Sequence, residues 1–186
     1  MDCLKRYDFL TQIECDTIVN EILSLEDAVK RLGPDTYGEG TSEDSLTGRY
    51  KYFNYLNIRS INTIICPKLK EIFGPCVVQC WANIFRQGEG IDEHRHISDK
   101  STNTVLTASG NIFLYGDPTT GTYYESVKYD NKVGELSLFP SDMLHGVPKN
   151  ITGDMRISMA IDVHTGDEVL LNVIVSEMPK RFFYIR

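Results

Sequence analysis

The sequence lacks long apolar runs, blocks of basic residues and segments of low complexity. A membrane-spanning helix needs about 20 consecutive apolar residues, so we expect no membrane partner. The Lys and Arg residues are scattered through a chain of formal net charge −7, which argues against nucleic acid as a partner. The N-terminus, MDCLKRYDFL, interrupts its short apolar run with charges and has no small-residue cleavage site. We therefore expect a cytoplasmic protein.

The cysteine pattern gives no sign of a disulfide framework. The five cysteines are odd in number, include no C-x-x-C pair and lie among apolar residues. This pattern is typical of reduced thiols that serve packing in a cytosolic protein. A chain of 186 residues with 41% hydrophobic content can bury one sizeable core. We therefore expect residues 1–186 to form a single domain.

Two amphipathic helices are predicted in the first 75 residues. Thr11 and Glu14 form a capping-box pattern, in which each side chain satisfies a free amide at a helix start. Apolar residues then recur at helical spacing until Gly33-Pro34 stops the run. The same spacing returns over Ser60–Phe73, and Gly74-Pro75 ends it.

The remaining segments predict loops and strands. Gly38–Gly48 is polar and glycine-rich, as in an exposed loop, and Tyr50–Leu56 alternates aromatic and polar residues, as in a short strand. Beyond Pro75 the segments are short, β-branched or aromatic, and bounded by turn residues. We expect strands near Val77–Gln87, Thr102–Thr107, Gly110–Tyr115, Thr122–Tyr129, Glu135–Phe139, Arg156–Val163 and Val169–Val175.

Together these elements predict an α+β fold with a mainly-β core. Short strands bounded by turns favour a sandwich or barrel over alternating strand and helix units. We expect residues 1–75 to form a helical support region packed on one sheet. Residues 76–186 then form the β core that carries the functional site.

Three of the four histidines suggest a metal site. His94 and His96 are two residues apart at the end of a strand-like run, and side chains with that spacing share one face of a strand. His145 follows an apolar strand that ends in a tight turn. Each signal is weak alone, but two distant segments that both offer imidazoles predict that His94, His96 and His145 bind one metal ion.

The segment RISMAIDV suggests an anion anchor. Arg156 and Ser158 share one face of a strand whose other positions are almost all apolar, so the strand is expected to be buried on both sides. A buried guanidinium is costly unless an anion meets it. Asp162 is six residues from Arg156 along the same strand, so the partner is either an acid from another strand or a bound anion.

A metal held by three protein ligands on one face keeps open positions for a chelating cosubstrate and for oxygen, as in non-haem iron oxygenases. A keto acid that chelates the metal at one end directs a second carboxylate towards an arginine. 2-Oxoglutarate (2OG) has this shape. Asn83, Tyr115 and Ser158 are further candidates to hold the cosubstrate, because polar groups on core strands need partners.

The sequence resembles the 2OG- and Fe(II)-dependent oxygenases, and in particular their prolyl-hydroxylase-like microbial and viral branch. The general pattern of that superfamily is His-x-Asp/Glu, a distal His and then an Arg about ten residues later, often as Arg-x-Ser. The matching segments are Trp81-Ala82-Asn83, His94-Arg95-His96, Ser109 to Leu114, Phe139-Pro140-Ser141 with His145-Gly146-Val147, and Arg156-Ile157-Ser158. The N-terminal FLTQIECDTIV is also similar to the helix that opens prolyl-hydroxylase-like members.

This resemblance covers roughly Val77–Val163 and implies both a fold and an activity. The implied fold is a double-stranded β-helix, or jelly roll, with helices packed outside one sheet and iron at its mouth. The implied enzyme is a dioxygenase, a hydroxylase that takes Fe(II), 2OG and O2, with Arg156 facing the distal carboxylate of 2OG. The prime substrate and the oligomeric state are not encoded in any motif.

His96 departs from the family pattern, because most of the superfamily has a carboxylate there. Three neutral imidazoles leave the metal charge uncompensated by protein ligands. Asp92, Glu93 or Asp99 is an alternative acidic ligand if the backbone bends. In another alternative, His96 is the first ligand and Ser98 takes a non-ligating place, as in halogenase-like sites.

Two other functions fit the same residues. One is a three-histidine, cupin-like dioxygenase or isomerase that needs no 2OG and uses Arg156 for the carboxylate of its substrate. The other is a non-catalytic jelly-roll module that binds a ligand at the site.

Overall fold

The computed structural model describes residues 4–32, 46, 49–96 and 105–186. The helices are α1 (Gln12–Lys30), α2 (Arg59–Phe73) and α3 (Glu168–Glu177), with short 3-10 turns η1 (Arg49–Lys51), η2 (Tyr55–Asn57) and η3 (Pro118–Thr120). The strands are β1 (Lys5–Asp8), β2 (Cys76–Phe85), β3 (Ile91–His94), β4 (Val105–Tyr115), β5 (Thr122–Tyr124), β6 (Val127–Tyr129), β7 (Glu135–Phe139), β8 (His145–Val147), β9 (Arg156–Thr165) and β10 (Phe183–Ile185).

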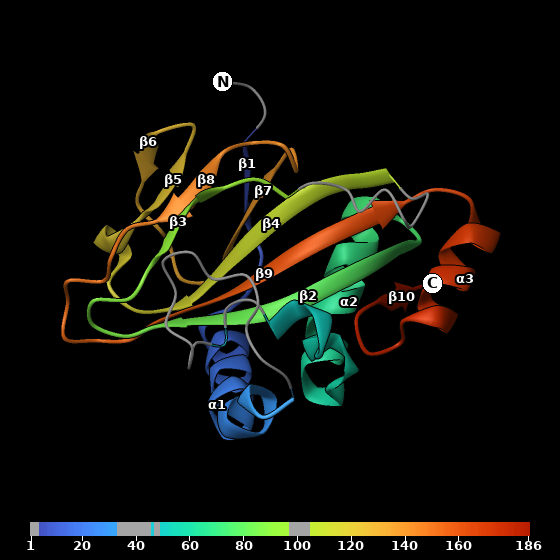
Figure 1. Ribbon diagram of the computed structural model, residues 1–186, viewed down its shortest axis with the longest axis horizontal. Helices are drawn as coiled ribbons and strands as arrows, with labels where there is room; N and C mark the ends of the chain where they lie inside the picture. Colours follow the sequence, from blue (N-terminus) through green and yellow to red (C-terminus); the bar gives the residue numbers. More distant parts are fainter. Residues whose placement is uncertain (1–3, 33–45, 47–48, 97–104) are drawn as a thin grey trace.

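The strands form two antiparallel sheets. The larger sheet has six strands in the order β1-β7-β4-β9-β2-β10, and the smaller has four in the order β3-β8-β5-β6. In Figure 1 the long strands β2, β9 and β4 cross the molecule, while the short strands of the smaller sheet lie together at one side. The structure therefore confirms a mixture of helix and sheet with a mainly-β core.

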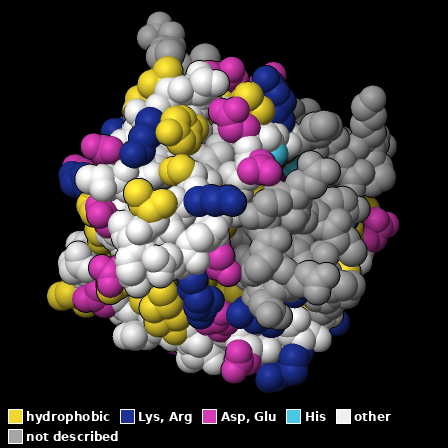
Figure 2. Space-filling model, turned by 60° about the vertical axis from the view of Figure 1, so that its left-hand side comes forward, with side chains coloured by type: hydrophobic (Ala, Val, Ile, Leu, Met, Phe, Trp, Pro, Cys, Tyr) yellow, Lys and Arg dark blue, Asp and Glu magenta, His cyan; other side chains and the backbone are white. Residues whose placement is uncertain are grey.

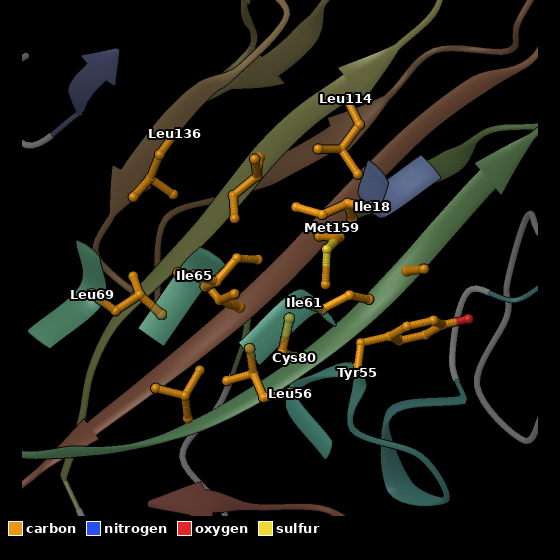
Figure 3. Close-up of a cluster of buried hydrophobic side chains, with 14 of the residues drawn as sticks. Ile18, Tyr55, Leu56, Ile61, Ile65, Leu69, Cys80, Leu114, Leu136 and Met159 are labelled. Carbon is orange, nitrogen blue, oxygen red and sulfur yellow. The ribbon is translucent and has the colours of Figure 1, made fainter. Parts of the chain in front are cut away.

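The first two helices cover one face of the six-stranded sheet. The predicted capping box is present, because the Thr11 side chain accepts a hydrogen bond from the Glu14 amide and the Glu14 carboxylate accepts one from the Thr11 amide. Apolar residues from both helices pack against β2, β4, β7 and β9 in one buried cluster. Figure 3 shows Ile18 of α1 and Ile61, Ile65 and Leu69 of α2 in this cluster, beside Met159 of β9.

Alternate side chains of the long strands point to opposite faces of the sheet, which have different environments. Ile157, Met159, Ile161 and Val163 of β9 belong to the cluster under the helices. The intervening residues of β9 point to the opposite face, towards the smaller sheet. This alternation is why Arg156, at the start of β9, can be buried without entering the apolar core.

The structure corrects the predicted strand at Val169–Val175, which is part of helix α3. Its β-branched residues resemble a strand, but Asp167 caps a helix there by accepting hydrogen bonds from the amides of Val169 and Leu170. The helix buries Leu171 and Ile174, which are three residues apart and pack with Val77 and Phe182. Helical spacing and a capping residue outweigh strand propensity here.

Other predicted elements change their bounds or type. Tyr50–Leu56 contains parts of η1 and η2 and no strand, and Thr122–Tyr129 is a hairpin of β5 and β6. The predicted strands Thr102–Thr107 and Gly110–Tyr115 belong to one strand, β4, as far as the description extends. The short strands β1, β8 and β10 were not predicted, and β3 covers the end of the strand-like run only as far as His94. The predicted loop at Gly38–Gly48 lies outside the described residues except for Leu46.

Two further observations concern predictions from composition. No helix in the described part of the chain is long and apolar enough to cross a membrane. The four described cysteines are free thiols, and Cys15, Cys76 and Cys80 are buried. Burial raises the pKa of Cys15 to about 11 and that of Cys76 to about 12, so neither is a reactive thiolate at neutral pH.

Candidate metal centre

The smaller sheet brings the three predicted histidines together. His94 ends β3 and His145 begins β8, and the antiparallel register places these two residues directly opposite each other. His96 lies two residues beyond β3, where its amide donates a hydrogen bond to the carbonyl of Ser141 at 2.8 Å. That bond holds the chain after β3 against the turn that precedes β8.

The three imidazoles face a common point. Their candidate ligand atoms all lie within 4.8 Å of one another, and within the described ranges they form the one such group of His, Cys, Asp and Glu side chains. The centroid of the His145 ring lies 4.3 Å from that of His94 and 4.8 Å from that of His96. Figure 2 shows histidine atoms at the surface beside acidic side chains. The side chains of His94 and His96 are partly exposed, whereas His145 is buried.

Hydrogen bonds fix the orientation of each ring. Nδ1 lies 2.8 Å from the carbonyl oxygen of Asp92 in His94 and 2.9 Å from that of Met143 in His145. Because a carbonyl oxygen only accepts hydrogen bonds, Nδ1 must carry the proton in both neutral rings, which leaves Nε2 with a free lone pair. Nδ1 of His96 lies 2.7 Å from Oδ1 of Asp162. All three rings therefore present the tautomer that a metal ligand needs.

Burial favours the neutral form of two of the three imidazoles, those of His145 and His94. It lowers the pKa of His145 to about 3, with a further contribution from the neighbouring histidines. Burial also lowers the pKa of His94, although its bond to the Asp92 carbonyl acts in the opposite direction. Unprotonated imidazoles at neutral pH are the form that binds first-row divalent metals. The donor set therefore fits such an ion.

Within the described residues, none of the alternative ligands belongs to the histidine cluster. The side chains of Asp92 and Glu93 are exposed on β3, and neither belongs to the cluster. Asp99 and Ser98, the other two alternatives, lie outside the described residues. Among the described residues, the acid in contact with the cluster is Asp162, which hydrogen-bonds to an imidazole from β9. From the sequence, Asp162 was considered only as a partner for Arg156.

Arg156 is a buried guanidinium without an acidic partner in the part of the chain that the structure describes. Its side chain is 1% exposed, and Nη2 donates to Oγ1 of Thr122 at 3.1 Å. Nε and Nη1 are buried without a hydrogen-bond partner. The guanidinium carbon lies 5.5 Å from the Phe85 ring centroid and 5.6 Å from that of Phe113. Burial lowers the pKa of Arg156 to about 10, yet the group remains charged at neutral pH.

A small cavity separates the histidines from the arginine. Its volume is about 50 Å³, enough for a few water molecules. Both sheets line it, and the lining includes all three histidines, Asn83, Phe85 and Thr122. Arg156 lies behind Phe85 and Thr122. A guest larger than water therefore needs side-chain movement to reach the guanidinium.

Of the other predicted cosubstrate-binding residues, Asn83 and Ser158 lie near this cavity and Tyr115 does not. Asn83 and Ser158 are opposite each other on β2 and β9, and Asn83 Oδ1 and Ser158 Oγ are buried without partners. Tyr115 is 45% exposed. A register shift between Phe113 and Tyr115 interrupts the alternation of β4, so two-residue spacing no longer predicts which face of the sheet a side chain occupies there.

Three residues near the site, Thr122, Tyr124 and Asp162, were not among the predicted site residues. Thr122 and Tyr124 alternate towards the cavity from β5, and the signal for them was the period-two spacing just before a turn. Asp162 follows Ser158 by four residues on one face of β9, and this spacing predicts that it points to the same side. The contact of Asp162 with His96 is a long-range feature that no local pattern reveals.

Several solved structures share this fold. The viral collagen prolyl hydroxylase vCPH from Paramecium Bursaria Chlorella virus-1, in complex with 2OG, matches with a TM-score of 0.58 and 14% identity over 89% of this chain and 97% of its own. A Pseudomonas putida prolyl-4-hydroxylase matches with a TM-score of 0.54 and 17% identity over 88% and 93%. The non-heme alpha-ketoglutarate-dependent carbocyclase SnoK from nogalamycin biosynthesis matches with a TM-score of 0.63 and 11% identity over 88% and 80%.

The chain therefore has the fold of the prolyl hydroxylases and 2OG-dependent oxygenases. This confirms, at the level of fold, the resemblance that the sequence motifs indicate. No protein-family model matches the sequence, and no curated protein matches it.

Proposed function

We propose that this protein is a 2OG- and Fe(II)-dependent oxygenase, a hydroxylase of an unidentified substrate built on a double-stranded β-helix. The observation that carries the proposal is the pairing of two unusual features across one cavity. Three imidazoles converge at one side of it, and behind the other lies a buried guanidinium with two nitrogens that have no hydrogen-bond partner among the described residues. A metal ion and a diacid would satisfy both features at once.

His94, His96 and His145 are the proposed metal ligands. Each would bind through Nε2, because Nδ1 is engaged by Asp92, Asp162 or Met143. When bound, Fe(II) with 2OG and O2 supplies the oxidising chemistry, in which 2OG loses CO2 to become succinate and one oxygen atom enters the substrate. The protein favours unprotonated imidazoles at His94 and His145 and keeps the cavity between the histidines and Arg156 small.

Arg156 is the proposed anchor for the distal carboxylate of 2OG. A guanidinium offers paired donors that match a carboxylate, and the two free nitrogens of Arg156 leave that capacity unused. Ser158 and Asn83 would contribute further polar contacts, since each has an unpartnered buried oxygen. Thr122, which now accepts the Nη2 bond, would have to move or share that donor.

A three-histidine dioxygenase or isomerase that does not use 2OG is the second candidate. The favouring observation is that the described metal-ligand cluster contains no carboxylate. In that enzyme Arg156 would hold the carboxylate of the substrate itself.

The first experiment measures cosubstrate binding and turnover separately. Under anaerobic conditions, Fe(II) and 2OG together should produce a visible absorption band of the metal-keto acid chelate. Under air with ascorbate, the same mixture should release succinate. Arg156→Gln should lose the band at 2OG concentrations that saturate the wild type while keeping the metal, whereas Arg59→Gln, at an exposed position on α2, should behave as wild type.

The outcomes separate the candidate functions. Metal binding with no chelate band and no succinate would reject 2OG as cosubstrate and support the three-histidine alternative. Failure of carefully reconstituted protein to hold metal would reject both enzymes and leave a binding module. Equal loss of metal from Arg156→Gln and a histidine variant would contradict the role assigned to Arg156.

A further inference from the structure

The three clustered histidines do not have equivalent partners. Nδ1 of His94 and of His145 faces a neutral main-chain carbonyl, whereas Nδ1 of His96 faces the carboxylate of Asp162 at 2.7 Å. His96 is also the ring at the position where the family pattern has a carboxylate. The one ionic partner therefore lies behind the one atypical ligand position.

Asp162 is held for this contact from the other sheet. It lies on β9 opposite Ser109 of β4, and Ser109 Oγ donates a hydrogen bond to Oδ1 of Asp162 at 2.6 Å. The same hydroxyl oxygen lies 3.0 Å from Nδ1 of His96. The Asp162 side chain is 13% exposed, and within the described residues its ion pair is with His96. In the described parts of the chain no Lys or Arg pairs with this buried carboxylate, and a second imidazole, that of His164, also interacts electrostatically with it.

Charge counting shows what such a carboxylate can do. Two imidazoles and one carboxylate leave a divalent ion with a net charge of about +1, whereas three imidazoles leave about +2. When an anion accepts the hydrogen bond from Nδ1–H of a ligating imidazole, Nε2 becomes a stronger electron donor to the metal. The same hydrogen bond fixes the tautomer of the ring. The carboxylate then compensates the metal charge without occupying a coordination position.

We propose, on the basis of the proposed function, that Asp162 is a positioning residue that replaces the missing carboxylate ligand by acting through His96. His96 and Asp162 form one unit, which delivers negative charge from β9 to a site built on β3 and β8. No proton leaves His96 in this arrangement, because the Nδ1 proton stays shared with Oδ1 of Asp162. Ser109 orients the carboxylate.

The test compares variants of matched size in anaerobic metal titrations. Asp162→Asn keeps the shape and removes the charge, and we expect its affinity for Fe(II) and Co(II) to fall by about 10–100-fold. Glu93→Gln removes a charge at an exposed position on β3, one residue from His94, and should change the affinity by less than about threefold. Ser109→Ala keeps the charge and loses one hydrogen bond, so its loss should be less than about tenfold.

A second measurement, the Fe(III)/Fe(II) reduction potential, distinguishes the loss of the Asp162 charge from a loss of rigidity at the site. The Fe(III)/Fe(II) potential should rise in Asp162→Asn, because Fe(III) depends more on the lost negative charge than Fe(II) does. Ser109→Ala should leave the potential nearly unchanged. Unchanged metal affinity and potential in a folded Asp162→Asn protein would overturn the proposal while leaving the proposed function standing. If the wild type binds no metal, the proposed function fails as well, so the two failures are distinguishable.

Discussion

At the residue scale, the burial of Arg156 has a cost to stability. A fully buried guanidinium whose Nε and Nη1 have no partner is destabilising. We predict that Arg156→Met raises the free energy of unfolding of the metal-free protein by roughly 1–3 kcal/mol while abolishing 2OG binding. Chemical denaturation and the anaerobic chelate band measure the two effects. A strongly destabilised variant would mean that Arg156 has a structural partner after all.

His145 should make the metal-free protein sensitive to acid. Because burial lowers its pKa to about 3, the unfolded chain binds a proton on this residue at pH values where the folded protein does not. Stability therefore falls as pH drops from about 6.5 to about 3, and is fully present above that window. His145→Gln should reduce this dependence. Denaturation of chelator-treated protein between pH 7 and 4 measures it, and parallel curves for the two proteins would contradict the prediction.

Residue spacing predicted much of the candidate site, and there is a physical reason why it did not predict the remaining residues. His94 and His96 share a strand-like spacing, and the distance from His145 to Arg156 matches a family pattern, so these residues were identified. The His96 contact with Asp162 joins residues 66 positions apart on different sheets. Tyr115 was predicted as a polar group on a core strand, but it lies at the end of β4 beyond a register shift and is 45% exposed.

At the scale of elements, the β5–β6 hairpin shows why turns are hard to read from sequence. Its turn residues Glu125 and Ser126 have φ values of 48° and 65°. Two-residue turns with positive φ normally carry Asn and Gly, so Glu-Ser gave no turn signal and the segment was predicted as one strand. By contrast, the capping box of α1 and the Gly-Pro stop of α2 are local signals, and both helices were predicted.

A serine-to-glycine substitution should have opposite effects on stability in this turn and in helix α1. Ser126→Gly removes backbone strain at φ 65°, so we predict a gain in unfolding free energy of about 0.5–1 kcal/mol. Ser24→Gly, at an exposed position within α1, should lose about 0.5 kcal/mol. Chemical denaturation of both variants checks the signs. Two losses of similar size would show that the turn does not hold the left-handed conformation.

At the scale of the whole molecule, the site joins two sheets of unequal strength. Strands β3, β5, β6 and β8 are three or four residues long, whereas β2, β4 and β9 have ten or eleven. Short strands with few long-range partners open more easily than a sheet that is covered by helices. The three clustered histidines lie in and beside the sheet of short strands, and the His96 bond to Asp162 connects them to β9. A bound metal should therefore stabilise the weaker sheet most.

Hydrogen exchange can measure this difference element by element. In the metal-free protein, we predict that amides of β3 and β8 exchange faster than those of β4 and β9. Metal at about 100 times its dissociation constant stabilises the bound state by about 2.7 kcal/mol, so exchange that requires opening of the site should slow by about 100-fold. Amides of β9 that exchange without site opening should change little.

The Asp162→Asn variant should need a higher metal concentration to reach saturation, because the link from His96 to β9 is weakened. At saturation, metal should still protect β3 and β8, because the three histidines remain. Equal protection of all strands by metal would mean that the two sheets open as one cooperative unit and that the site does not bridge independent parts.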